Sequence, residues 1–222
     1  AALQMVPTPR VEENLKTAAG LVAQAVAQGA QLVALPEYFP IMGLSDADKC
    51  AVRAVDGQGA IQDFLAATAR KHGIWLVGGS LPLVAAEAGK VLNSCLVFDP
   101  RGERVARYDK IHLFGFQKGA ERYNESATIE AGSQPVVFDA PFGRVGVSIC
   151  YDIRFPELYR AQGAVDLQII PAAFTETTGR AHWEILLRAR AIENQCYVLA
   201  VAQGGKHENG RETHGNSMLI DP

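Results

Sequence analysis

The stretch Asn93-Ser94-Cys95-Leu96-Val97 recurs as Asn216-Ser217-Met218-Leu219-Ile220, and both copies run into Asp-Pro. Further correspondences, in the same order along the chain, link residues 75–77 with 198–200, residues 62–72 with 184–195, and residues 32–36 with 167–171. Matched segments in a conserved order predict two similar halves. We therefore expect two similar sheets that pack together, with helices outside them.

The segments around these repeats alternate between buried strands and amphipathic helices. Residues 11–28 and 61–72 have helical periodicity and end at Gly29 and Gly73. Strand patterns cover residues 32–35, 74–78, 92–98 and 104–108. This alternation predicts an α/β layered fold, and no linker or low-complexity segment divides it. We expect one domain over residues 1–222, with a C-terminal hairpin strand and tail missing, because the second Asp-Pro has no continuation.

Composition and charge exclude several classes of protein. Hydrophobic residues make up 48% of the 222 residues and charged residues 20%, which is typical of a globular protein with a substantial core. A formal net charge of −3 favours neither a nucleic acid nor an acidic membrane as partner, since both attract basic patches. The longest apolar runs, such as residues 74–77, are too short to cross a bilayer, and no signal peptide pattern is present.

The four cysteines are Cys50, Cys95, Cys150 and Cys196. They form no CxxC pair, so neither a zinc site nor any other metal site is expected. A disulfide framework is not expected in a chain with a good core. We expect reduced cysteines in a cytoplasmic protein, most of them buried as small apolar residues.

Cys150 lies where a strand passes into a helix. Residues 144–149 alternate like a strand, and Pro156 stands near the start of a helix. A thiol at such a junction faces backbone N–H groups of the following turn, which favours the thiolate and offers an oxyanion hole. The alternative, a buried core cysteine, is as good an interpretation of this segment taken alone.

Glu37 and Lys110 also stand at strand ends. Glu37 directly follows the apolar run 32–36, which places it at the C-terminal end of a strand. Ligands bind at these strand ends in open α/β sheets. A partly buried glutamate has a raised pKa and can act as a general base. Lys110 lies between a strand and the apolar segment 111–114, so it could be buried beside the thiol. Taken singly, a solvated loop glutamate and a surface lysine are the better interpretations.

Together these segments resemble the nitrilase superfamily of carbon–nitrogen hydrolases. The segments Leu35-Pro36-Glu37, Asp109-Lys110-Ile111-His112-Leu113 and Ile149-Cys150-Tyr151-Asp152 are similar to the motifs around that family's glutamate, lysine and cysteine, in the same order. The resemblance covers essentially the whole chain. It implies a four-layer α-β-β-α sandwich with an internal pseudo-two-fold repeat, and a Glu–Lys–Cys catalytic set that needs no metal or organic cofactor.

The resemblance also implies a second glutamate between the lysine and the cysteine. Glu125, in Asn124-Glu125-Ser126, is the best match. Glu121 and Glu130 are nearby competitors.

Three segments narrow the resemblance to the Nit branch, and within it to deaminated glutathione amidases more than to ω-amidases: residues 150–158, 178–184 and 188–198. This implies hydrolysis of a small, carboxylate-bearing amide through a thioester. N-carbamoyl amidohydrolase and true nitrilase remain alternatives within the enzyme class. A non-catalytic binding or scaffold protein of the same fold is the alternative outside it, and the presence of Cys150 argues against that alternative.

The implied mechanism assigns each site residue a role. Glu37 takes the Cys150 proton, and Lys110 and the backbone N–H of Tyr151 stabilise the oxyanion. Arg154, four residues past the nucleophile, is expected to hold the substrate carboxylate with two parallel hydrogen bonds. Phe174, Thr175 and Thr178 are expected to complete the pocket. Family members commonly pair through helices corresponding to residues 155–161 and 182–194, so a homodimer or higher homo-oligomer is expected.

Overall fold

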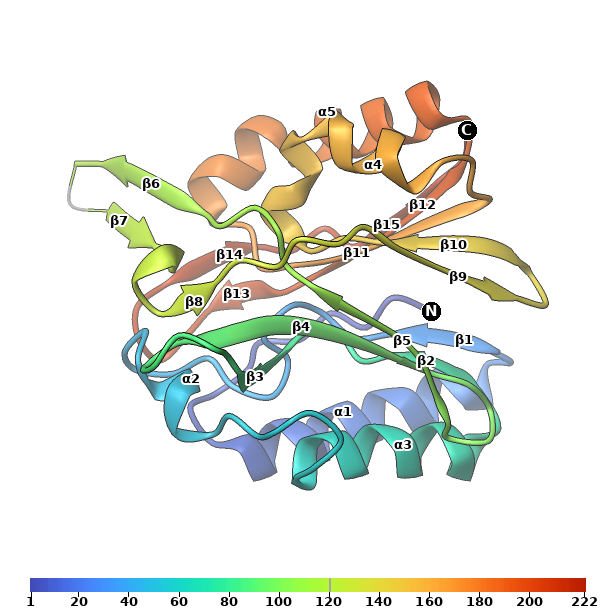
Figure 1. The fold of residues 1–222 in the computed structure, drawn as a ribbon, viewed down its shortest axis with the longest axis horizontal. Coiled ribbons are helices and arrows are strands. Elements are labelled where there is room, and N and C mark those ends of the chain that lie inside the picture. Colours follow the sequence, from blue (N-terminus) through green and yellow to red (C-terminus); the bar gives the residue numbers. More distant parts are fainter. Residues whose placement is uncertain (120) are drawn as a thin grey trace.

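Two β-sheets face each other in the middle of the computed structural model, which describes residues 1–119 and 121–222 (Figure 1). The first sheet consists of β1 (Leu32–Ala34), β2 (Trp75–Val77), β3 (Leu81–Val84), β4 (Val91–Phe98), β5 (Arg104–Asp109) and β8 (Ile129–Glu130). Helices α1 (Val11–Ala27) and α3 (Ala60–His72) cover its outer face, and the short α2 (Asp48–Ala51) lies at one end. Glycine in the left-handed conformation ends α3 at Gly73, as the sequence predicts.

The second sheet has the strand order β15-β12-β11-β10-β9. Its strands are β9 (Val136–Ala140), β10 (Gly143–Val147), β11 (Leu167–Ala172), β12 (Tyr197–Ala202) and β15 (Met218–Ile220). Helices α4 (Pro156–Gln162) and α5 (Glu176–Asn194) cover its outer face (Figure 1). The layers therefore follow the order helix, sheet, sheet, helix, and the α/β prediction is confirmed.

The two halves repeat the same connections. Strands β1 and β2 are parallel with α3 between them in the chain, and β2 pairs antiparallel with β4. In the second half, β11 and β12 are parallel with α5 between them, and β12 pairs antiparallel with β15. This agrees with the repeat found in the sequence. Between the sheets, apolar side chains of both halves form one buried cluster, which includes Ala34, Val77 and Val97 opposite Phe138, Val145 and Ile169.

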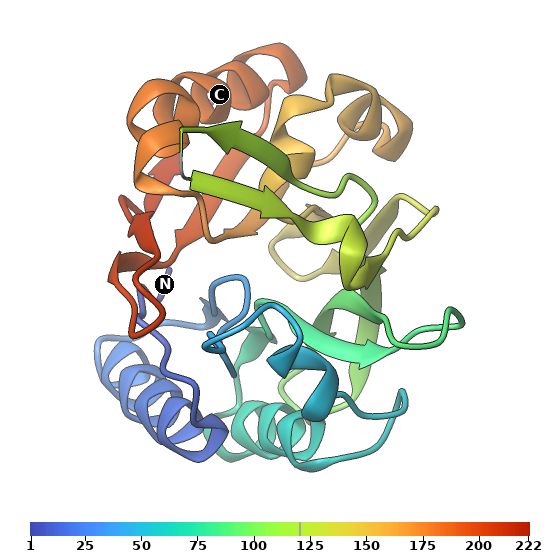
Figure 2. The ribbon, with the colours of Figure 1, turned by 90° about the vertical axis from the view of Figure 1, so that its left-hand side faces the viewer.

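Short elements frame one end of the sandwich (Figure 2). They are the hairpin β6 (Gly115–Lys118) and β7 (Glu121–Asn124), the turn η1 (Glu125–Ala127), and the hairpin β13 (Gly204–Lys206) and β14 (Glu212–His214). The chain leaves β1, β5 and β11 toward this end, and η2 (Cys150–Arg154) follows β10 there. Polar residues at the ends of these strands are thereby brought together from both sheets.

Candidate active site

Glu37 follows β1 and lies at the seam between the sheets. Its side chain is 1% exposed. One carboxylate oxygen accepts hydrogen bonds from Asn93 Nδ2 at 3.0 Å and Lys110 Nζ at 2.8 Å, and the other accepts from Ala173 N at 2.9 Å. The side chain of Gln203 donates to the Glu37 carbonyl. The carboxylate is therefore fixed in one orientation by groups from three segments, and a fourth segment holds the backbone.

Lys110 is fully buried between two carboxylates. Besides Glu37, its ammonium group contacts Glu125 Oε1 at 3.0 Å and Oε2 at 2.8 Å. Burial alone would lower the pKa of Lys110, but the charges of Glu125 and Glu37 outweigh it, and the pKa lies above its ordinary value. A buried charge is tolerated when it is paired and hydrogen-bonded. Lys110 is therefore a fixed cation rather than a proton carrier.

Glu125 is the second glutamate of this cluster. It starts η1 and, besides Lys110, accepts hydrogen bonds from Tyr38 OH at 2.8 Å and Phe114 N at 2.7 Å. Burial would raise its pKa, but Lys110 reverses this effect and lowers the pKa below its ordinary value. The competing carboxylates are engaged elsewhere: Glu121 accepts from Thr177 Oγ1 and Glu130 from Glu87 N.

Cys150 stands at the start of η2 with φ of 52°, the left-handed conformation that few non-glycine residues adopt. Its side chain is 7% exposed and lines a small cleft with Phe114, Tyr151, Ala173, Phe174, Thr175 and Thr178. Burial raises the pKa of the thiol well above its ordinary value, the charge of Glu37 raises it further, and Lys110 offsets this only in part. The expectation that the turn favours a thiolate is wrong: the resting group is a thiol, which needs a base.

Asp152 holds this turn, and the sequence interpretation missed it. One of its oxygens accepts from Ile149 N at 2.8 Å and Tyr108 OH at 2.7 Å. The other contacts His112 N at 2.9 Å and His112 Nδ1 at 2.8 Å. Asp152 thus ties the turn that carries the thiol to the segment that carries Lys110. Its place two residues after Cys150 was the one available signal.

The predicted substrate-binding residues lie around the Cys150 cleft. The Arg154 guanidinium lies over the rings of Tyr151 and Phe174, 5.6 and 5.5 Å from their centroids, and contacts His182 Nδ1 at 3.2 Å. It pairs with neither Asp152 nor Glu157 in the part of the chain that the structure describes. Thr175 caps α5 by accepting from Thr178 N at 3.2 Å, and the two hydroxyls are 2.9 Å apart.

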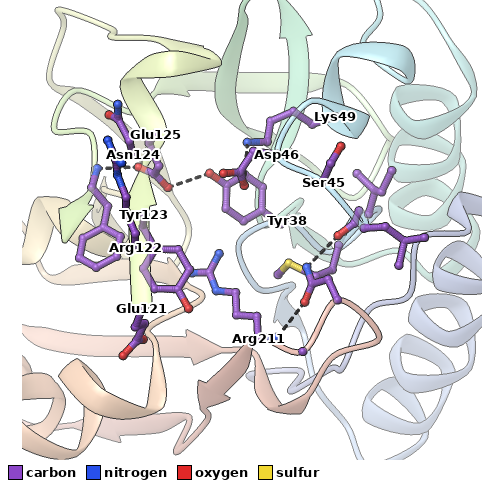
Figure 3. Close-up of a pocket in the computed structure, with 17 residues that line it drawn as sticks. Tyr38, Ser45, Asp46, Lys49, Glu121, Arg122, Tyr123, Asn124, Glu125 and Arg211 are labelled. Atoms are coloured by element: carbon purple, nitrogen blue, oxygen red, sulfur yellow. Dashed lines mark hydrogen bonds and ion pairs between the residues drawn. The ribbon is translucent and has the colours of Figure 1, made fainter. Parts of the chain in front are cut away.

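A larger pocket of about 500 Å³ opens beside Glu125 (Figure 3). Its lining includes Tyr38, Lys49, Phe114, Tyr123, Glu125 and Arg211. Phe114 also lines the Cys150 cleft, so the two cavities adjoin there. The sequence interpretation did not find Lys49 or Arg211, since Lys49 lies in the four-residue helix α2 and Arg211 in a hairpin loop, and neither segment has a periodic pattern.

The sequence profile of the carbon–nitrogen hydrolase family matches residues 1–222. This chain belongs to the carbon–nitrogen hydrolase family. It is accordingly a hydrolase that acts on carbon–nitrogen bonds other than peptide bonds, and the predicted resemblance to the nitrilase superfamily is confirmed.

Similar carbon–nitrogen hydrolases include several amidases. A deaminated glutathione amidase of Synechocystis sp. is 47% identical over 229 residues, covering 100% of this chain and 83% of that protein. Nit3 of Saccharomyces cerevisiae, a member of branch 10 of the nitrilase superfamily, has a TM-score of 0.87 at 30% identity, over 100% of this chain and 81% of its own. An amidase of Nesterenkonia sp. AN1, with acrylamide added at its active site cysteine, has a TM-score of 0.81 at 28% identity. The match covers 100% of this chain and 84% of that amidase.

Within residues 1–119 and 121–222, no helix is both long enough and apolar enough to cross a membrane. Within the same residues, no group of three or more His, Cys, Asp and Glu side chains is arranged to hold a metal ion.

Proposed function

We propose that this carbon–nitrogen hydrolase is an amidase that cleaves deaminated glutathione, with Cys150 as nucleophile. The observation that carries the proposal is the buried cluster of Glu37, Lys110 and Glu125 next to a thiol whose pKa is raised. A protonated thiol beside a fixed carboxylate is the arrangement that general-base activation of a nucleophile requires. The similarity to a deaminated glutathione amidase supports the choice of substrate.

Glu37 carries the proton in the proposed reaction. It accepts the Cys150 proton as sulfur attacks the amide carbonyl, and it gives that proton to the leaving amine when the carbon–nitrogen bond breaks. The acyl group stays on sulfur as a thioester. Glu37 then takes a proton from water, which attacks the thioester and releases the acid and the free thiol.

Lys110 and the backbone N–H of Tyr151 stabilise the oxyanion of each tetrahedral intermediate. Lys110 suits this role because Glu37 and Glu125 keep it charged and fixed, so it needs no reorganisation when negative charge develops. Removing one such donor costs about 3–4 kcal/mol of transition-state stabilisation in other enzymes.

The substrate assignment is tested by amine or ammonia release from four compounds: deaminated glutathione, α-ketoglutaramate, a carbamoyl amino acid and a nitrile. We expect deaminated glutathione to have the highest kcat/KM. A preference for α-ketoglutaramate would instead identify an ω-amidase. Turnover of the nitrile alone would contradict the proposal that the enzyme is an amidase.

Cys150→Ala tests the nucleophile. We expect the variant to keep its fold by circular dichroism and to release no amine, because no other group can form the thioester. Cys50→Ala is the matched control, since the Cys50 sulfur hydrogen-bonds to the Gly89 carbonyl and Cys50 does not line the Cys150 cleft. An active, folded Cys150→Ala protein would show that the thiol is not the nucleophile.

A further inference from the structure

The 500 Å³ pocket beside Glu125 is lined by three cationic residues that the proposed mechanism does not use, Lys49, Arg211 and the exposed Arg122, and by the acidic Asp46, Glu121 and Glu125. Lys49 comes from α2, and Arg211 comes from the loop between β13 and β14. Figure 3 shows both reaching into the same cavity, with Tyr38 and Tyr123 as its aromatic walls. Phe114 lines both this cavity and the Cys150 cleft, so the two sites are neighbours.

Arg211 is held in place without a counter-ion. Its Nη2 donates to the Ala173 carbonyl at 2.8 Å, and its guanidinium lies 4.9 Å from the centroid of the Tyr123 ring. Its Nε is buried and has no hydrogen-bond partner. No carboxylate of residues 1–119 or 121–222 pairs with it. An unpartnered buried donor on an arginine is costly, and it is satisfied by a planar anion such as a carboxylate.

Lys49 is also poorly neutralised. Its side chain is 12% exposed, and its amino group donates to Thr128 Oγ1 at 3.1 Å and lies over the Tyr38 ring. Its nearest carboxylate is Asp46 at 3.9 Å, on a side chain that is 69% exposed. Burial lowers the pKa of Lys49, and the charges of Asp46 and Glu125 offset this effect only in part. The charge of Arg211 lowers the pKa as well.

We propose that Lys49 and Arg211 form a second carboxylate subsite, in the pocket that shares Phe114 with the Cys150 cleft. The inference rests on the proposed function, since it assigns the second end of the same substrate. It makes the preferred substrate an amide with a carboxylate on each side of the scissile bond. Deaminated glutathione has this chemistry: one carboxylate belongs to its acyl half and the other to the leaving dipeptide.

The test measures binding separately from turnover. Calorimetry on the Cys150→Ala protein gives Kd for three probes: deaminated glutathione, its C-terminal carboxamide, and the analogue whose acyl half ends in a methyl ketone. Each probe is titrated again after adding Arg211→Gln or Lys49→Met. Arg101→Gln is the matched control, because that side chain is 75% exposed and pairs only with Asp99 and Glu103.

We expect each pocket variant to weaken binding of deaminated glutathione by about ten- to a hundredfold, as loss of a charged hydrogen bond predicts. One single-carboxylate probe should bind the variants as it binds the parent, and its identity shows which carboxylate the subsite holds. Equal weakening of all three probes would overturn the proposal, because Arg211 would then act only by supporting Ala173. No effect on any probe, or no binding of any probe, would overturn it too.

Turnover by the unmodified enzyme separates this inference from the proposed function. Failure to hydrolyse any probe, together with variant-sensitive binding, would refute the deaminated glutathione assignment and leave the subsite supported. Hydrolysis of the probes, with variant-insensitive binding, would refute the subsite alone.

Discussion

Lys110 keeps its charge inside the protein only because two carboxylates surround it. Glu125 contributes two of its three carboxylate contacts and is itself oriented by Tyr38 and Phe114. The two alternative glutamates, Glu121 and Glu130, hydrogen-bond to Thr177 and to the Glu87 backbone and not to Lys110. In the proposed mechanism, Glu125 therefore positions the cation that stabilises the oxyanion.

Glu125→Gln should lower kcat by about ten- to a hundredfold, because a charge-assisted hydrogen bond worth about 1.5–3 kcal/mol is replaced by a neutral one. Initial rates on deaminated glutathione measure the effect. Glu130→Gln is the control and should keep the parent rate, since Glu130 bonds only the Glu87 backbone in the described chain. Parent-like activity of Glu125→Gln would remove Glu125 from the mechanism.

Arg154 is fixed by two aromatic rings and His182 rather than by a carboxylate. Arg154→Lys should reduce kcat/KM by about ten- to a hundredfold, because lysine cannot form two parallel hydrogen bonds to a carboxylate. The reduction should be much smaller for an amide that lacks the carboxylate. Equal losses on both amides would show that Arg154 is structural and that the carboxylate is bound elsewhere.

Among the elements, the turn between β10 and α4 combines an unusual backbone with a buried anchor. Cys150 has a left-handed φ, and such a conformation persists only where the surroundings impose it. Asp152 imposes it through bonds to the Ile149 backbone, Tyr108 and His112. The His112 ring also stacks on Phe155, with centroids 3.7 Å apart.

Asp152→Asn should lower the free energy of unfolding by about 1–3 kcal/mol. Both Asp152 oxygens accept hydrogen bonds, and the NH₂ group that replaces one of them cannot accept. Urea denaturation measures the loss, and kcat should fall with it as the thiol moves. Asp139→Asn on the exposed face of β9 is the control. Unchanged stability of Asp152→Asn would mean that the turn holds its shape without this carboxylate.

The set of Glu37, Lys110 and Cys150 was predicted from the similarity of three motifs to those of the nitrilase superfamily, in the same order. Strand ends alone did not predict it, because Lys110 follows the largely polar β5, and each of the three residues taken singly had a structural interpretation at least as good. Asp152 could not be assigned its role, because its partners Tyr108 and His112 come from a distant segment.

Lys49 and Arg211 could not be predicted for a related reason. They meet because the short α2 and the loop between β13 and β14, from opposite halves of the chain, lie at the same end of the sandwich. A four-residue helix and a hairpin loop leave no periodic signal in the sequence. The raised pKa of Cys150 was equally hidden, since it depends on how completely the docked sheets exclude water from the thiol.

For the whole molecule, the sequence predicts association with a second copy. The predicted pairing helices lie in α4 and α5, but their largest apolar side chains, Trp183, Leu187, Leu158 and Tyr159, are buried within the monomer. Ile185, which is 70% exposed, and Ile192 remain on the outer face of α5. An apolar pair on a helix surface is a feature that a symmetric interface would cover.

Ile185→Glu should shift the protein from dimer to monomer in sedimentation velocity experiments, because an interface cannot bury an unpaired carboxylate without a large cost. Val55→Glu, which changes an exposed apolar residue far from α5 in the sequence, should leave the sedimentation coefficient unchanged. A parent protein that sediments as an active monomer at every concentration would contradict the predicted pairing.

The hydrogen bonds that hold Glu37 link catalytic activity to the last stage of folding. Asn93 and Lys110 reach the residue from the first half of the chain, whereas Ala173 and Gln203 reach it from the second. Neither helix-covered sheet alone can orient the base, because each supplies only part of these contacts. Recovery of activity therefore marks the final docking of the two halves, and it should lag behind the recovery of secondary structure. A newly synthesised chain should therefore have no amidase activity until its two halves have docked.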